Sequence, residues 1–128
     1  MAEHNTTGKL GEDIATEYLQ NKGYEIIERN WRPKKSRLEV DIIAKNETNI
    51  AIVEVKTRKS TQWGEPEEFI NWKKIKFITD AAQIYVCTHE IGNLEPRFDT
   101  ISIVMNKENK VEKIEHIEGA WIPKPKYY

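Results

Sequence analysis

Two short apolar runs carry charges where the interior of a sheet would be expected, and this pattern limits the fold more than any other. Residues 37–44 read RLEVDIIA and residues 50–58 read IAIVEVKTR, with a polar stretch between them. Runs of this length, rich in Val and Ile and joined by a polar turn, predict a β-hairpin. A buried carboxylate without a partner is costly, so acids inside such strands indicate a compensating charge, for which a metal ion is one candidate. The hairpin is therefore a candidate functional site.

The alternation of side chains along a strand predicts which of these residues face one another. If residues 46–49 form a four-residue loop, Lys45 lies opposite Ile50 and Asp41 lies opposite Glu54. In the same register, Glu39 faces Lys56. One face of the hairpin would then carry Glu39, Asp41, Ile43, Glu54 and Lys56, and the other would carry Leu38, Val40, Ile42, Val53 and Val55. Three acids and a lysine would share one patch.

This patch has the composition of a site for a hard metal ion. Directly opposed carboxylates repel each other in an ordinary sheet but are favourable where a divalent cation lies between them. Carboxylate oxygens suit Mg²⁺ or Mn²⁺, and Mg²⁺ takes one or two carboxylates together with waters and substrate phosphates. The pattern indicates a phosphodiester substrate, with Asp41 and Glu54 as metal ligands and Glu39 as an auxiliary ligand. Lys56 would steady the developing negative charge or help to deprotonate the nucleophile.

A second interpretation explains the same residues without catalysis. A solvated, charged sheet face held by cross-strand ion pairs would show the same alternation. An acid two residues before a lysine arises by chance about twice in a chain of this composition. Glu108-Asn109-Lys110 is such a triplet, in a polar stretch. Residue spacing alone leaves both interpretations open.

The chain resembles a known family over nearly its whole length. Asp41 followed by Glu54-Val55-Lys56 is similar to the Asp…(Asp/Glu)-x-Lys signature of the restriction-endonuclease-like (PD-(D/E)xK) nuclease superfamily. More narrowly, the sequence resembles the YraN-like family, uncharacterised protein family 0102. The blocks that carry this resemblance are Gly8-Lys9-Leu10-Gly11-Glu12 with Ala15, Tyr18 and Leu19, Gly23-Tyr24, Arg29-Asn30-Trp31-Arg32, Glu39-Val40-Asp41-Ile42-Ile43-Ala44, Glu54-Val55-Lys56-Thr57-Arg58, Gly64-x-Pro66 and Arg97-Phe98-Asp99.

The resemblance implies a metal-dependent nuclease core, with Asp41 and Glu54 as metal ligands and Lys56 as the catalytic lysine. It also implies that Glu12, on the first helix, faces the same site. One position departs from the family pattern, because Leu38 stands where a glycine usually precedes the Glu-x-Asp block. Since alternation assigns Leu38 to the buried face, we expect a packing adjustment there.

The remaining pattern predicts one α/β domain over residues 1–122 and a loose tail over residues 123–128. Apolar spacing predicts a helix over residues 9–22, with Thr7 as cap, Gly8–Gly11 as its first turn and Gly23 as its stop. The other expected elements are a strand over residues 24–31, the hairpin, a helix over about residues 67–86, and strands over residues 97–105 and 110–117. The order α-β-β-β-α-β-β predicts a restriction-endonuclease-like mixed β-sheet flanked by helices, which the family resemblance also implies.

Basic residues surround the hairpin in the sequence, as a rim that guides a phosphate backbone would require. The formal net charge is −1, so phosphate binding depends on local clusters. We expect DNA, rather than RNA, to contact Arg32, Lys34, Lys35, Arg37, Arg58 and Lys59. Each cluster is equally compatible with an ordinary solvated face. Trp31 and Trp63 would stack on bases or serve as packing residues.

Other features set the compartment and the alternatives. No apolar run is long enough to span a bilayer and no secretory signal is visible, so we expect a cytoplasmic protein. Cys87 is alone, which excludes an intrachain disulfide. Arg97 and Asp99 share a strand face and are expected to pair, whereas His4, His89 and His116 are expected at the surface or in packing roles. The alternative to a nuclease is a non-catalytic module that binds nucleic acid or another partner. A homodimer is an expectation by analogy with small nucleases that cut two strands.

Overall fold

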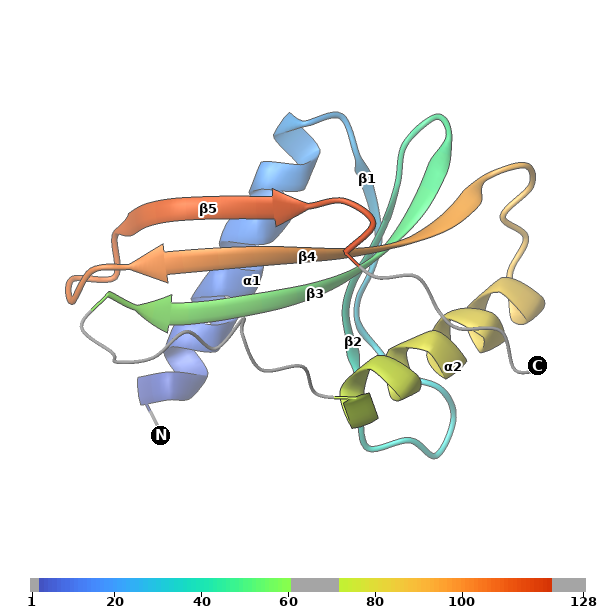
Figure 1. Ribbon diagram of the computed structural model, residues 1–128, viewed down its shortest axis with the longest axis horizontal. Helices are drawn as coiled ribbons and strands as arrows, with labels where there is room; N and C mark the ends of the chain where they lie inside the picture. Colours follow the sequence, from blue (N-terminus) through green and yellow to red (C-terminus); the bar gives the residue numbers. More distant parts are fainter. Residues whose placement is uncertain (1–2, 61–71, 121–128) are drawn as a thin grey trace.

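The structure is a computed structural model that describes residues 3–60 and 72–120. Two helices and five strands are found in this part of the chain (Figure 1). In chain order they are α1 (Glu3–Asn21), β1 (Glu25–Trp31), β2 (Val40–Lys45), β3 (Asn49–Lys59), α2 (Trp72–Thr88), β4 (Glu95–Met105) and β5 (Val111–Ile117). The predicted order of helices and strands is confirmed.

The strands form one open mixed sheet in the order β1-β2-β3-β4-β5. Strands β3 and β4 are parallel, and the other neighbouring strands are antiparallel. The parallel pair requires a crossover, which contains α2. The expected class, a mixed sheet flanked by helices, is therefore confirmed. In the part of the chain that is described, neither helix has the length and apolar character needed to cross a membrane.

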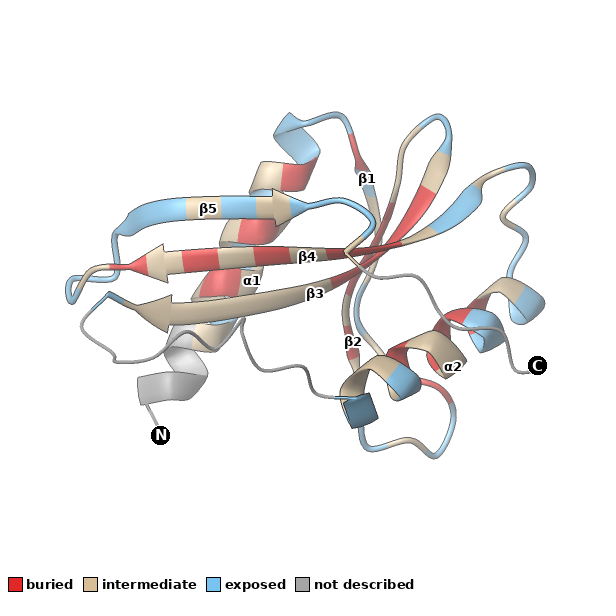
Figure 2. Ribbon diagram, viewed as in Figure 1, coloured by how far each residue is buried: buried red, intermediate tan, exposed pale blue. Residues whose placement is uncertain are grey.

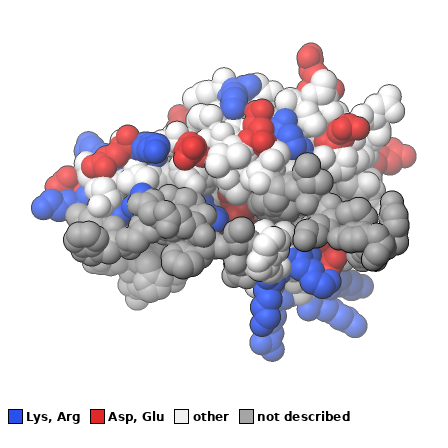
Figure 3. Space-filling view, in the orientation of Figure 1, with Lys and Arg blue, Asp and Glu red and all other residues white. Residues whose placement is uncertain are grey.

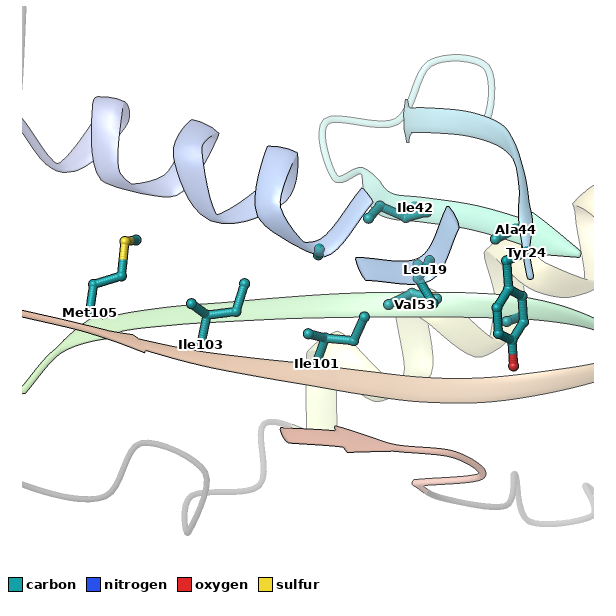
Figure 4. Close-up of a cluster of buried hydrophobic side chains, with 10 residues drawn as sticks. Leu19, Tyr24, Ile42, Ala44, Val53, Ile101, Ile103 and Met105 are labelled. Atoms are coloured by element: carbon teal, nitrogen blue, oxygen red, sulfur yellow. The ribbon is translucent and has the colours of Figure 1, made fainter. Parts of the chain in front are cut away.

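The helices cover opposite faces of the sheet, and each seals a separate apolar core. The α1 core, drawn in Figure 4, consists of Ala15, Leu19, Tyr24, Ile42, Ala44, Ala51, Val53, Ile101, Ile103 and Met105. The α2 core consists of Val40, Ile43, Ile50, Ile52, Ile78, Ala81, Ala82, Tyr85 and Phe98. Figure 2 shows that the buried residues concentrate in the central strands and on the inner sides of the two helices. Residues that alternate along β3 therefore face different helices.

Helix α1 starts earlier than predicted. It begins at Glu3, so Thr7 lies inside the helix and the prediction of a cap there is wrong. Its end agrees with the prediction, since Gly23 follows in the left-handed region with φ of 98°. Gly11 is buried inside the helix, and a Cβ atom at this position would lie 2.0 Å from Thr57 Oγ1. The glycine lets α1 approach β3 closely, and its interpretation as part of a first turn is wrong.

The hairpin has the predicted register but an unexpected break. Lys45 pairs with Ile50, and the ladder continues to Ile42 opposite Val53. Val40 and Ile42 were expected on one face, yet Val40 packs in the α2 core and Ile42 in the α1 core. The alternation therefore fails at Asp41, between them.

Leu38 is 47% exposed, so the prediction that it lies on a buried face is wrong. The reason is that β2 begins only at Val40. Leu38 belongs to the preceding connection, where its amide donates a hydrogen bond to Ser36 Oγ.

The later elements largely match their predicted ranges. Helix α2 is described from Trp72 and extends to Thr88, with Ile78, Ala82 and Tyr85 buried as its spacing predicts. Trp31 meets Tyr85 edge-on and belongs to the α2 core, which gives it a packing role. Trp63, the expected start of the second helix at residues 67–71, and the predicted tail at residues 123–128 lie outside the described residues.

Candidate active site

Asp41 lies where β2 and β3 separate. The ladder between these strands ends at Ile42 opposite Val53, so Asp41 and Glu54 do not form the backbone pair that the sequence predicted. Instead, Asp41 Oδ2 accepts a hydrogen bond of 2.8 Å from the amide of Val55. The carboxylate thus takes the place of a backbone acceptor and joins the two strands. This contact holds Asp41 beside the residue that follows Glu54.

Glu54 projects from β3 toward α2. Its neighbours Val53 and Val55 pack on the α1 side, while Glu54 Oε1 lies 3.7 Å from Lys74 Nζ on α2. The Glu54 side chain is only 16% exposed. Among the described residues, its Oε1 atom is buried and accepts no hydrogen bond. Such an oxygen is costly in a protein interior unless a further positive group or donor satisfies it.

The two acids influence each other strongly. Burial raises the pKa of the Glu54 carboxyl to about 7, and the charge of Asp41 adds to this rise, while Lys74 and Lys56 oppose it. Burial also raises the pKa of the Asp41 carboxyl, while the hydrogen bond from the Val55 amide, the charge of Lys74 and a hydrogen bond with Glu54 lower it. A hard cation would stabilise the ionised form of two half-buried carboxyls whose pKa values are both raised.

Glu12 approaches the same site from α1. Its Oε1 atom accepts a hydrogen bond of 3.0 Å from Asn30 Nδ2 and lies 3.7 Å from Arg29 NH2, both on β1. Burial raises the pKa of the Glu12 carboxyl, and Asp41 is the largest charge that adds to the rise. The expected position of Glu12, facing the acids of the hairpin, therefore agrees with the electrostatics of the structure.

Glu39 and Lys56 complete the cluster. The charge of Glu39 raises the pKa of both Asp41 and Glu12, and the charge of Lys56 lowers the pKa of Glu54. The ladder of β2 and β3 does not extend to these two residues, so their predicted pairing is wrong. We refer to Glu12, Glu39, Asp41, Glu54 and Lys56 together as the acidic site.

The donor set fits a hard divalent cation with few protein ligands. Asp41 and Glu54 supply hard oxygens, and Glu54 Oε1, which accepts no hydrogen bond from a described residue, is an oxygen that an ion could satisfy. Over residues 3–60 and 72–120, no three His, Cys, Asp or Glu side chains are already arranged to hold an ion together. A site with two carboxylates, in which water and phosphate complete the coordination, is the kind that Mg²⁺ accepts.

The predicted nucleic-acid contacts lie on two segments that adjoin the acidic site along the chain. Arg32, Lys34, Lys35 and Arg37 are exposed on the connection between β1 and β2. Arg58 and Lys59 are half-buried at the end of β3. In Figure 3, Lys and Arg side chains project at the lower right, where Figure 1 places α2 and the connection between β1 and β2.

Comparison with known proteins places the chain in a family. The model of the uncharacterised protein family UPF0102 matches residues 11–103. The chain belongs to this family. A UPF0102 protein of Flavobacterium psychrophilum is 48% identical over 121 residues, which cover 94% of this chain and 98% of that protein. A UPF0102 protein of Bacteroides thetaiotaomicron is 44% identical over 123 residues, covering 96% of this chain and 98% of the relative. The matched range of the UPF0102 model contains every residue of the acidic site.

In this UPF0102 member, the structure adds to the site contacts that sequence reasoning did not assign, although Arg29 and Lys74 belong to basic clusters that flank the hairpin in the sequence. Lys74 reaches Glu54 from α2, and Arg29 and Asn30 reach Glu12 from β1. Lys74 follows Glu54 by twenty residues, and its position depends on how the crossover helix packs. The Arg29-Asn30 block could have been found from the family resemblance, which included it without a role.

A second polar cluster, the Asp99 network, lies between β4 and β5. The carboxylate of Asp99 is fully buried. It accepts hydrogen bonds from Arg97 Nε and NH2, both at 2.8 Å, and from the Gly119 amide at 3.1 Å. His116 Nε2 lies 2.8 Å from the same carboxylate. Although burial opposes ionisation, His116 and Arg97 hold the pKa of Asp99 down to about 2.

Two predictions concern this network. The pairing of Arg97 with Asp99 is confirmed. His116 was expected to be an ordinary surface or packing residue, but its side chain is 1% exposed and contacts a buried carboxylate. The surface alternative is therefore wrong and the packing alternative holds, since the ring also meets Tyr18 and Tyr24 edge-on. Residue spacing did not reveal the carboxylate partner, because it comes from the neighbouring strand. His89 is exposed and stacks on Tyr85, as a packing residue would.

Proposed function

We propose that the protein is a divalent-metal-dependent nuclease that hydrolyses phosphodiester bonds in DNA. The observation that carries this proposal is the half-buried pair Asp41 and Glu54, in which burial raises the pKa of both carboxyls, the charge of Asp41 raises that of Glu54 further, and Glu54 Oε1 accepts no hydrogen bond from a described residue. Membership in UPF0102 and the order of elements around a mixed sheet support a restriction-endonuclease-like core. We assign Asp41 and Glu54 as the residues that hold Mg²⁺ or Mn²⁺.

The surrounding residues then have distinct roles. The Val55 amide fixes Asp41, and Lys74 balances the charge of Glu54. Lys56 lies two residues after Glu54 on the same strand and acts on it electrostatically. We assign its ammonium group to stabilising charge on a phosphate or to helping deprotonate the attacking water. Glu12 and Glu39 add negative charge around Asp41 as auxiliary ligands. When bound, the metal ion would polarise the phosphoryl group and lower the pKa of the water.

The substrate would approach over basic side chains. The exposed residues Arg32, Lys34, Lys35 and Arg37 lie on the connection that leads into β2 and therefore into Asp41. Arg58 and Lys59 follow Lys56 along β3. Phosphate contacts of this kind give binding that weakens steeply with salt and carries little sequence information.

Cleavage assays with matched variants test the proposal. Purified protein is incubated with branched, single-stranded and duplex DNA, and with RNA, in Mg²⁺ and in Mn²⁺. Asp41→Ala and Lys56→Ala should each abolish cleavage, because one removes a metal ligand and the other the ammonium group. Glu108→Ala and Lys110→Ala are controls of identical chemistry from the other acid-x-Lys triplet and should cleave like the wild type.

Two results would overturn the assignment. Cleavage that persists in both Asp41→Ala and Lys56→Ala would come from a contaminant. Salt-dependent binding of DNA without turnover, unaffected by Asp41→Ala, would instead establish a non-catalytic nucleic-acid-binding module on the same scaffold.

A further inference from the structure

Asn30 has an unusual backbone conformation for a residue inside a strand. Its φ is 53°, in the left-handed region that non-glycine residues rarely adopt. The other described non-glycine residues with positive φ, Lys35 and Asn109, lie in connections between strands. Such a conformation costs free energy and persists where the surrounding structure holds it, commonly at functional sites.

The position of Asn30 in the sheet links it to Asp41. Arg29 pairs with Ile42 and Trp31 pairs with Val40, so Asn30 stands directly opposite Asp41. This is the level at which β2 breaks its alternation, with Ile42 in the α1 core and Val40 in the α2 core. The positive φ of Asn30 and the broken alternation of β2 therefore occur at one level of the sheet, where the Asp41 carboxylate accepts a hydrogen bond from the Val55 amide.

The side chain of Asn30 links the same level to Glu12. Asn30 Nδ2 donates to Glu12 Oε1 at 3.0 Å, while NH2 of the adjacent Arg29 lies 3.7 Å from the same oxygen. In a regular strand, neighbouring side chains point to opposite faces, so two consecutive residues could not both reach one carboxylate on a helix. The left-handed backbone at Asn30 turns its side chain to the α1 side, so that Asn30 and Arg29 both reach Glu12 Oε1.

We propose that Asn30 is a positioning residue of the acidic site, which holds Glu12 toward Asp41 through its amide while its backbone sets the break that aims Asp41. This inference rests on the proposed function, since it assigns a role within the same site. It differs from a purely conformational role, in which asparagine is present only because it tolerates positive φ. In that case, glycine would serve equally well.

The variant Asn30→Gly separates the two roles, because it keeps the left-handed backbone and removes only the amide. Asn109→Gly is the matched control, since Asn109 also has positive φ, 63°, but lies in the turn before β5. Both variants should unfold at the same temperature as the wild type or higher. Asn30→Gly alone should weaken Mn²⁺ binding about tenfold by calorimetry and lower kcat for DNA more than it changes KM.

A double-mutant cycle with Glu12→Ala completes the test. If Asn30 acts through Glu12, Asn30→Gly should weaken Mn²⁺ binding no further in the Glu12→Ala background. Full additivity in the cycle, or an Mn²⁺ affinity of Asn30→Gly equal to that of Asn109→Gly, would overturn the role of Asn30 and leave the nuclease proposal intact. A wild type that binds no Mn²⁺ would overturn both.

Discussion

At the scale of single residues, Glu54 shows how a local cost can indicate function. Its carboxyl group is buried on the α2 side of β3, beside a second acid, and its Oε1 accepts no hydrogen bond from a described residue. Lys74 offsets part of this cost from 3.7 Å, a distance too long for a hydrogen bond. A residue chosen for stability alone would be apolar at this position, like Ile52 two residues earlier.

The cost should be measurable as a dependence of stability on pH. Burial, with a further contribution from Asp41, raises the pKa of Glu54 from 4.5 to about 7, so the folded state binds the proton more tightly than the unfolded chain. The free energy of unfolding should therefore fall as the pH rises from 4.5 to about 7, by about 3 kcal/mol from this group. Urea titrations in metal-free buffer should show this fall in the wild type and a much smaller one in Glu54→Gln.

The control for this measurement is Glu108→Gln, which changes an exposed glutamate outside the site. It should keep the wild-type pH dependence. Addition of Mn²⁺ at pH 7 should restore stability to the wild type but not to Glu54→Gln, because an ion that binds only the folded state stabilises it. Parallel pH curves for the wild type and Glu54→Gln would contradict the buried-acid interpretation.

At the scale of elements, the acidic site depends on how closely α1 packs against β3. Gly11 provides this approach, and the next residue, Glu12, is the one that reaches the site.

The predicted hairpin register was confirmed because a four-residue turn and a two-residue period are local properties. The break in side-chain alternation at Asp41 could not be predicted in the same way, since it accompanies a left-handed backbone at Asn30 on another strand. For the same reason, the apolar character of Leu38 and Val40 did not predict that Leu38 is exposed before β2 or that Val40 packs in the α2 core.

The contact between α1 and β3 should respond sharply to one methyl group. Gly11→Ala would place Cβ 2.0 Å from Thr57 Oγ1 and force the helix outward, so we expect a loss of about 1–3 kcal/mol in the free energy of unfolding. The same displacement should weaken Mn²⁺ binding, because Glu12 moves with the helix.

Gly8→Ala is the matched control, since Gly8 lies in the same helix and its Cβ would meet no atom of a described residue beyond its own helix backbone and chain neighbours within 4 Å. This variant should be as stable as the wild type or more so, because alanine favours a helix. In addition, Thr57→Ala should partly rescue Gly11→Ala by removing the clashing oxygen. Equal effects of the two glycine substitutions would show that helix propensity, and not the close approach, decides the outcome.

At the scale of the whole molecule, the fold keeps two buried polar clusters with opposite electrostatic character. The acidic site combines α1, β2 and β3 with Lys74 of α2, and its carboxyl groups are destabilised by burial. The Asp99 network joins β4 and β5 to Tyr24, whose hydroxyl accepts a hydrogen bond from Arg97, and its carboxylate is fully compensated. We therefore assign the Asp99 network to the stability of the fold and the acidic site to function.

This division of roles predicts opposite responses to mutation. Asp99→Asn should lower the free energy of unfolding by about 3 kcal/mol at neutral pH, because it removes the buried carboxylate that pairs with Arg97 at 2.8 Å and leaves Arg97 with the longer contact to Glu118 at 3.7 Å. The pKa of Asp99 is lowered from 3.8 to about 2, so the stability that its ionised form gives is complete above pH 3.8 and is lost as the pH falls through about 2. Acid unfolding of the wild type in that window should be absent from Asp99→Asn. Its Mn²⁺ affinity, measured at a temperature where the variant is folded, should equal that of the wild type. A loss of metal binding in Asp99→Asn would show instead that the two clusters act as one coupled unit, with β4 transmitting the change to its parallel neighbour β3.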